Sequence, residues 1–213
     1  MGTVRRPVAW LALLAGLLTG CDVSARSADV TVSGHGSSGA AESAGTVGAA
    51  GSACALPVTF DIAVGWKAEA VDGLGAVASG GPDGDLAGSL LRQGPVTLVC
   101  EIDAKPAGAI GFLRVSTGKP GGGDARAVLR AFVAAEDGAG RARYRTFAAG
   151  GLAGVRVDYV QTGKLLGESK KESALAVVTP QGPVVLHLGG LDSAEHDEML
   201  PAFELAQDTL RTR

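Results

Sequence analysis

The apolar run from Val8 to Leu18 limits which part of this chain can contribute to a fold. Arg5 and Arg6 precede the run, and two small residues follow it. A basic start, a short apolar core and a small-residue cut site are the three parts of a secretory signal peptide. The alternative is an uncleaved membrane anchor, but the run is shorter than the roughly 20 residues that a bilayer span needs. We therefore expect residues 1–20 to be a signal peptide and the fold to come from the rest of the chain.

The four residues Leu18-Thr19-Gly20-Cys21 resemble the lipobox of bacterial lipoproteins. The resemblance implies that the Cys21 thiol is acylated with diacylglycerol and that cleavage makes Cys21 the new N-terminus. Such a protein is extracytoplasmic and is held in the outer leaflet of the cytoplasmic membrane. Two or three acyl chains anchor a protein stably, whereas one chain binds only marginally.

The charge balance excludes some partners. Loss of Arg5 and Arg6 with the signal peptide would leave 17 basic against 22 acidic residues, a formal charge of −5 with histidine neutral. Nucleic acids are bound through clustered lysine and arginine, so we expect no nucleic-acid partner. The same balance disfavours electrostatic adhesion to a membrane, so the lipid has to supply the attachment. We expect a monomer without a cofactor.

Two cysteines remain once Cys21 is lipidated. In an oxidising compartment an even pair predicts a disulfide, here between Cys54 and Cys100. Two separate buried thiols are the alternative. A C-x-x-C motif is absent, which argues against a catalytic thiol pair.

The composition changes at Cys54. Residues 22–53 are almost all Gly, Ala, Ser, Val and Thr and follow neither a helical nor a strand period. We expect residues 21–53 to be a lipidated N-terminus followed by a flexible tether. Residues 54–213 then form one domain.

The hydrophobic pattern of residues 54–213 predicts an α+β fold. An apolar stripe indicates a mid-chain helix over 124–136, and a second indicates a C-terminal helix over 192–210, which Pro201 should kink or divide. An antiparallel sheet of about six or seven strands accompanies them. Eight segments have a strand pattern and are the candidates for these strands: residues 56–64, 67–71, 96–103, 110–116, 144–148, 154–162, 171–179 and 183–188.

This order of elements resembles the Mog1/PsbP-like fold. The segment LPVTFDIAVGW at residues 56–66 looks like the start of the LpqN-like group of actinobacterial lipoproteins of that fold. The resemblance implies a non-catalytic binding or assembly module. It supplies no catalytic residues for this chain.

Motifs for catalysis or metal binding are weak. The segment at residues 36–39 fails the G-x-S-x-G pattern of a serine nucleophile, and no P-loop spacing occurs. His187 alternates within a strand, and we expect it to face solvent or to be hydrogen bonded. His196 lies four residues after Asp192, a common spacing that does not make a zinc site without further ligands. We expect no metal.

If the protein has a partner, we expect it to meet the Gly-rich loop over residues 72–94 or the neighbouring Trp66. Loops carry function more often than the elements they join, and tryptophan is enriched in binding hot spots. Asp83 and Asp85 in this loop resemble half of a calcium loop, but the distal glutamate is missing, which favours a turn. The competing interpretation places Trp66 in the core.

These features favour a non-catalytic binding or scaffold module at the cell envelope. One alternative is a carrier of an apolar envelope molecule, with a cavity lined by residues such as Phe132, Val155 and Leu186. An envelope hydrolase is the other alternative, but the sequence lacks a constellation of acid, base and nucleophile. The partner would be an envelope protein or an apolar ligand.

Overall fold

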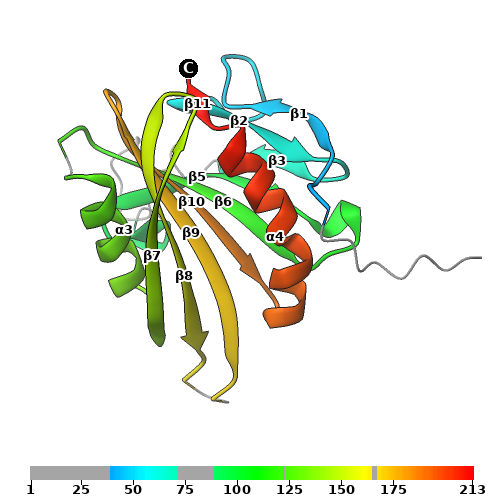
Figure 1. The fold of residues 1–213 in the computed structure, drawn as a ribbon, viewed down its shortest axis with the longest axis vertical. Helices are drawn as coiled ribbons and strands as arrows, with labels where there is room; N and C mark the ends of the chain where they lie inside the picture. The colour runs from blue at the N-terminus through cyan, green and yellow to red at the C-terminus, as the bar shows by residue number, and fades with distance from the viewer. Residues whose placement is uncertain (1–38, 72–88, 122, 165–166) are drawn as a thin grey trace, which may run out of the picture. The chain divides into compact units, whose positions relative to one another are not determined.

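The computed structural model describes residues 39–71, 89–121, 123–164 and 167–213, all within one compact unit, Ser37–Arg213. An eight-stranded antiparallel sheet has the order β3-β5-β6-β10-β9-β8-β7, with β4 also paired to β5 (Figure 1). Its strands are β3 (Lys67–Ala70), β4 (Arg92–Gln93), β5 (Val96–Asp103), β6 (Gly111–Gly118), β7 (Ala139–Ala149), β8 (Leu152–Thr162), β9 (Ser169–Thr179) and β10 (Gly182–Gly190). The short 3-10 helix η1 (Lys105–Ala107) joins β5 to β6. The predicted α+β class with an antiparallel sheet is confirmed, and the sheet exceeds the expected size by the two-residue strand β4.

A second sheet of three strands has the order β1-β2-β11. It consists of β1 (Ser43–Val47), β2 (Val58–Ala63) and β11 (Arg211–Thr212). The Asp61 carboxylate on β2 accepts hydrogen bonds from the hydroxyls of Ser43 (3.0 Å) and Thr46 (2.6 Å) on β1. The prediction of a tether through residue 53 is therefore wrong for β1, whose small residues are ordered by pairing with β2. Residues 1–38 of the predicted signal peptide and tether lie outside the described residues.

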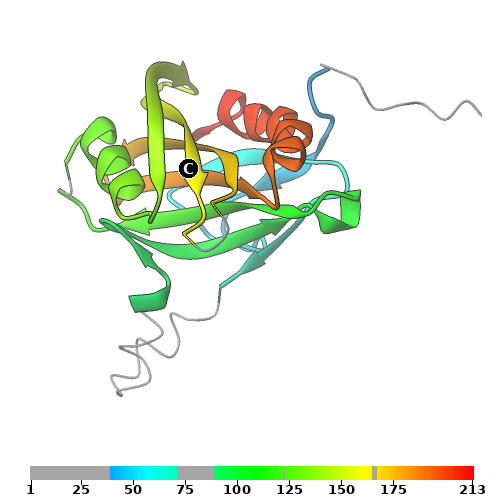
Figure 2. The ribbon, with the colours of Figure 1, turned by 90° about the horizontal axis from the view of Figure 1, so that it is seen from below.

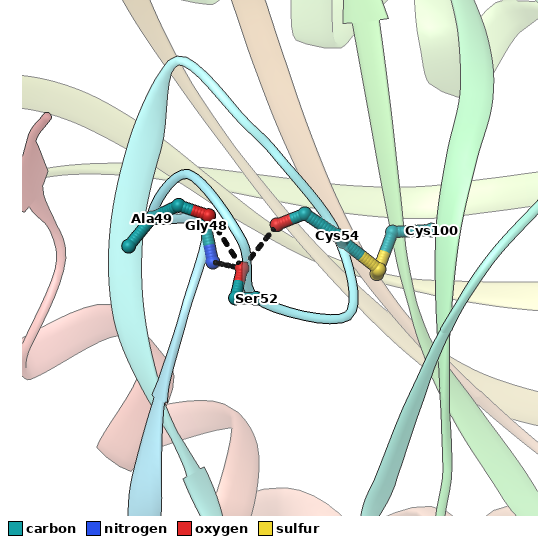
Figure 3. The surroundings of a disulfide bond; sticks show 5 residues. All are labelled: Gly48, Ala49, Ser52, Cys54 and Cys100. Carbon is teal, nitrogen blue, oxygen red and sulfur yellow. Dashed lines mark hydrogen bonds between the residues drawn. A yellow bond between two sulfur atoms is a disulfide. The ribbon is translucent and has the colours of Figure 1, made fainter.

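The disulfide predicted between Cys54 and Cys100 is present, with the two Cα atoms 6.0 Å apart (Figure 3). Cys54 lies in the connection from β1 to β2, and Cys100 lies on β5 of the main sheet. The Ser52 hydroxyl orders this connection through contacts of 2.7 Å with the carbonyl oxygens of Ala49 and Cys54. The disulfide thus fastens the smaller sheet's first connection to the main sheet.

Helix α3 (Ala125–Ala134) fulfils the prediction of a mid-chain helix. Asp124 is its N-cap, and the carboxylate accepts a hydrogen bond of 2.7 Å from the backbone N–H of Ala127. The buried stripe of α3 packs against a core cluster that also includes residues of β8, β9 and β10. The helical members of that cluster are Val128, Leu129, Phe132 and Val133.

Helix α4 (Ser193–Asp208) is continuous through Pro201, so the kink or division expected there does not separate two helices. The Asp192 carboxylate caps the helix by accepting from the N–H groups of Ala194 (2.8 Å) and Glu195 (3.0 Å). Glu195 does not complete a capping box. Its carboxylate accepts instead from the N–H of Ile110 at 2.9 Å, which ties α4 to the segment before β6.

The two helices cover opposite faces of the main sheet, and both views place β7 and β8 between them (Figures 1 and 2). Alternation along β8 sets these faces, since successive strand side chains point in opposite directions. Val157 packs into the core cluster with α3. The guanidinium of the adjacent residue, Arg156, lies over the Phe203 ring of α4, with Cζ 5.0 Å from the ring centroid. The larger core cluster lies on the α4 side and includes β2 and the disulfide.

Candidate functional site

A pocket of about 550 Å³ opens on the α3 side of the main sheet, past the C-terminal end of that helix. We call it the α3 pocket. Its walls come from β4, from the end of α3, and from neighbouring ends of β6, β9 and β10. The lining residues are Arg92, Gln93, Ile110, Gly111, Phe112, Arg114, Ala135, Glu136, Asp137, Lys170, Glu172, His187, Gly189, Gly190 and Leu191. A volume of this size is typical of small-molecule sites.

Glu172 and His187 form the buried, polar floor of the α3 pocket. His187 Nε2 lies 2.9 Å from Glu172 Oε2 and 3.1 Å from the Tyr159 hydroxyl. The Tyr159 hydroxyl in turn donates to the Glu136 carboxylate. Because both carboxylates only accept, the Tyr159 oxygen accepts from His187, and Nε2 must carry the proton that Glu172 and Tyr159 share. Four residues from three strands and the end of α3 are thereby linked.

Lys170 completes the neutralisation of Glu172. Its ammonium lies 2.8 Å from Glu172 Oε1 and donates to the carbonyl of Gly190 at 3.0 Å. Only 1 % of the Glu172 side chain is exposed. Burial acts to raise the pKa of Glu172, but hydrogen bonds and charges of His187 and Lys170 outweigh it, so its pKa lies below the usual range. The floor of the pocket therefore holds an ionised carboxylate.

Tyr159 remains protonated throughout the physiological pH range. Burial is the main cause of its raised pKa, and the neighbouring carboxylates of Glu136 and Glu172 raise it further. A neutral phenol is a lasting hydrogen-bond donor, and it fixes one oxygen of Glu136.

The rim of the α3 pocket carries further charges and an apolar edge. Arg114 donates to Glu101 at 2.8 Å, and its guanidinium lies 5.3 Å from the centre of the Phe112 ring. Ile110 and Leu191 are joined by a backbone hydrogen bond of 3.0 Å, and the two residues are 56 % and 65 % exposed. The pocket thus presents charged, aromatic and aliphatic groups together.

A second polar network lies on the α4 side and has the residue types of a catalytic triad. Ser173 Oγ is 3.0 Å from His196 Nε2, and His196 Nδ1 is 3.3 Å from the Asp197 carboxylate. Ser173 is completely buried, and its hydroxyl also donates to Asp158 at 2.8 Å. None of these residues lines the α3 pocket. A nucleophile has to reach its substrate, so we assign this network to the attachment of α4 to β9.

Of the residues predicted for a partner surface, Trp66 lies within the described part of the chain. Trp66 is half-buried and packs against the larger core cluster, which supports the interpretation of Trp66 as a core residue. Cys21, Asp83 and Asp85 lie outside the described residues, as does most of the predicted loop over 72–94. At the end of that range, Arg92 and Gln93 form β4, contrary to the prediction of a loop through residue 94.

The cavity expected for an apolar carrier is not formed by the residues named for it. Phe132 and Val155 belong to the core cluster under α3, whereas Leu186 belongs to the cluster on the opposite face. Leu186 therefore cannot line a cavity with the other two. None of the three lines the α3 pocket.

His187 and His196 are both buried and hydrogen bonded. Within the described ranges, no three His, Cys, Asp or Glu side chains are grouped so as to hold a metal ion. In the same ranges, no helix is long and apolar enough to cross a membrane.

Comparison with known proteins gives the family. The family model described as an uncharacterised lipoprotein matches residues 21–210. The chain belongs to this lipoprotein family. Among curated proteins, none matches the chain significantly. The structure is similar to the solution structure of cyanobacterial PsbP (CyanoP) from Synechocystis sp. PCC 6803, with a TM-score of 0.47 and 13 % identity, covering 80 % of this chain and 99 % of that one.

Sequence reasoning did not find Glu172, Lys170, Tyr159 or Glu136 as site residues. Strand β9 begins at Ser169, two residues before the strand expected over 171–179, and so includes Lys170 as well as Glu172. The available signal was Glu172, a carboxylate at an inward position of a strand. A buried charge requires a partner, so this position indicates a polar site.

Proposed function

We propose that the protein is a lipoprotein anchored through Cys21 on the outer side of the cytoplasmic membrane, and that it acts there as a non-catalytic binding module. The α3 pocket is its binding site. Membership of a lipoprotein family supports the anchor, and the family match begins at Cys21, the residue that the lipobox assigns as the mature N-terminus.

The observation that carries the binding role is the ionised, buried Glu172 at the floor of an open pocket. Well-packed apolar residues often stabilise a protein as well as a buried ion pair, or better. Stability alone therefore gives little reason to place Glu172, Lys170 and His187 together. A pocket with convergent polar groups is the usual form of a small-molecule site.

The chemistry of the lining supports binding rather than catalysis. Among the described residues that line the α3 pocket there is no Ser, Thr or Cys. Glu172 is held by Lys170 and His187, and Glu136 accepts from Tyr159. The charged lining also favours a polar ligand over the apolar cargo of a carrier.

The anchor is tested by fractionating cells that express Cys21→Ser. The altered protein should leave the membrane fraction, whereas a Ser24→Ala control should stay in it. Retention of Cys21→Ser in the membrane would exclude anchoring through this residue.

Binding at the α3 pocket is tested in intact cells by photo-crosslinking. A photoreactive side chain placed at Phe112, in the pocket, should capture a ligand. The same group at Arg143, on β7, serves as the control. Equal capture at both positions, or none at Phe112, would contradict the assignment of the binding site.

A further inference from the structure

Most charged side chains of the α3 pocket already have an opposite charge beside them. Arg114 pairs with Glu101 at 2.8 Å, and Lys170 pairs with Glu172 at 2.8 Å. Asp137 pairs with Lys164 at 2.6 Å. A ligand gains little by competing for these groups, since each is neutralised within the protein.

Two charged lining residues have no such partner. Among the described residues, Arg92 forms no ion pair or hydrogen bond through its side chain, and Glu136 has no cationic partner, only the neutral Tyr159 hydroxyl on Oε2. Arg92 comes from β4, and Glu136 follows the end of α3. The neighbouring Gln93 amide donates to the carbonyl of Phe132 at 3.3 Å, which holds β4 beside the last turn of α3.

The position of Glu136 favours a cation. It follows the C-terminal end of α3, where the helix dipole adds negative potential to that of the carboxylate. Tyr159 fixes Oε2 and leaves Oε1 available. Arg92, by contrast, offers a guanidinium whose planar donors match a carboxylate or a phosphate.

The apolar rim supplies a third feature. Ile110 and Leu191 are adjacent, more than half exposed, and lie in the same lining as the Phe112 ring. An apolar group resting here would be removed from water.

We propose that the α3 pocket binds a zwitterion that carries an ammonium group, an acidic group and an apolar part. The ammonium group meets Glu136, the carboxylate or phosphate meets Arg92, and the apolar part rests on Ile110 and Leu191. A short peptide and the headgroup of an aminophospholipid share this chemistry. The proposal rests on the assignment of the α3 pocket as the binding site, and it names the class of ligand.

The test compares dileucine with two derivatives, each of which lacks one of its two charges. Titration calorimetry on the purified full chain with Cys21→Ser would compare dileucine with its C-terminal amide, which lacks the negative charge, and with N-acetyl-dileucine, which lacks the positive charge. Dileucine should bind about tenfold more tightly than either derivative, because each charge-assisted contact is lost in one of them. Equal affinities for the three probes, or no binding of any, overturns the proposal.

Two variants assign the charges to their residues. Arg92→Gln should remove the advantage of dileucine over its amide, and Glu136→Gln should remove the advantage over the N-acetyl form. Arg143→Gln and Glu198→Gln, both at exposed positions outside the lining, should change neither ratio. Arg92 is exposed, so its variant is informative even if Glu136→Gln does not fold. The reverse assignment, or unchanged ratios in both variants, contradicts the proposal.

The source of the zwitterion is separated with vesicles of phosphatidylglycerol with and without phosphatidylethanolamine. Co-sedimentation that needs phosphatidylethanolamine and is lost in Arg92→Gln assigns a lipid headgroup. Dileucine binding without such co-sedimentation assigns a free peptide or amino acid. If charge discrimination fails while the Phe112 crosslink persists, the ligand class is wrong but the binding site stands. If both fail, the binding site is wrong as well.

Discussion

Glu172 on β9 and His187 on β10 face the same pocket and share a hydrogen bond of 2.9 Å between Oε2 and Nε2. The Glu172 side chain is 1 % exposed and that of His187 is 10 % exposed. Such a pair keeps a carboxylate ionised beneath an open site. Its partners Lys170, Tyr159 and Glu136 extend it from the floor of the α3 pocket to the end of α3.

Removal of the Lys170 charge should destabilise the fold. Lys170→Met leaves the buried carboxylate of Glu172 with His187 as its remaining partner, and we expect the free energy of unfolding to fall by about 2 kcal/mol. Urea unfolding measures the change. Lys67→Met is the matched control, because Lys67 pairs with Glu69 at 2.6 Å but both side chains are 67 % exposed. Such a surface pair contributes at most about 1 kcal/mol, so equal losses in the two variants would argue against an ionised, buried Glu172.

Stability should fall as the pH is lowered below about 6.5, the ordinary pKa of histidine. Burial lowers the pKa of His196 in the folded state, although the adjacent Asp197 acts to raise it. The unfolded chain therefore takes up this proton first, and the stability present at neutral pH is lost as the pH falls towards the lowered pKa. One such group contributes at most about 1.4 kcal/mol per pH unit.

The pH dependence is measured by urea unfolding between pH 5 and pH 7.5. His196→Gln should reduce the dependence of the free energy of unfolding on pH in this window. The loss of stability at lower pH should remain, because the lowered pKa values of Glu172 and Asp197 act there in the same direction. An unchanged slope in His196→Gln would show that His196 is not the group responsible.

Loss of the disulfide should lower the free energy of unfolding by up to about 4 kcal/mol, the chain-entropy value for a closed loop of this length. Cys54 and Cys100 are 46 residues apart and join the β1–β2 connection to β5. The double variant Cys54→Ala with Cys100→Ala, compared with the oxidised protein by urea unfolding, measures the effect. Equal midpoints would mean that the disulfide adds no stability.

Gly111 should not tolerate a side chain. A Cβ atom at this position would lie 2.3 Å from the terminal carbon of Met199 and 2.5 Å from the carbonyl oxygen of Gly189. Gly111→Ala is expected to cost about 1–3 kcal/mol through overpacking. Gly140→Ala is the control, because nothing lies within 4 Å of its Cβ position. A thermal melt compares the two, and a stable Gly111→Ala would contradict the close packing of α4 on β6.

The helices and most strands were predictable because their apolar periods are local. The stripe that includes Leu129 and Phe132 identified α3, and alternation through Val155 and Val157 identified β8. Strand β1 was not predicted because its residues are small and form a strand only by pairing with β2. The Asp61 carboxylate on β2 stabilises this pairing by accepting a hydrogen bond from Ser43. The hydrophobic pattern within a segment contains no information on such pairing.

The α3 pocket could not be predicted for a similar reason. Its floor brings Glu136 and Tyr159 together with Glu172 and His187, and these residues come from the end of α3 and from three strands. Which of them meet depends on strand register, as in the pairing of Tyr159 with Glu172 across β8 and β9. The sequence predicted that His187 lies on a strand and either faces solvent or is hydrogen bonded, and it indicated no partner for the side chain.

Occupancy of the α3 pocket decides the claim that it binds a small ligand in the envelope. Native mass spectrometry of protein taken from membranes would compare the wild type with Ala135→Trp, which fills the pocket from its lining, and with Ala134→Trp, an exposed neighbour that does not line it. We predict a small-molecule adduct on the wild type and on Ala134→Trp, and its loss from Ala135→Trp. An adduct retained in full by Ala135→Trp, or a wild type without any adduct, would contradict the claim.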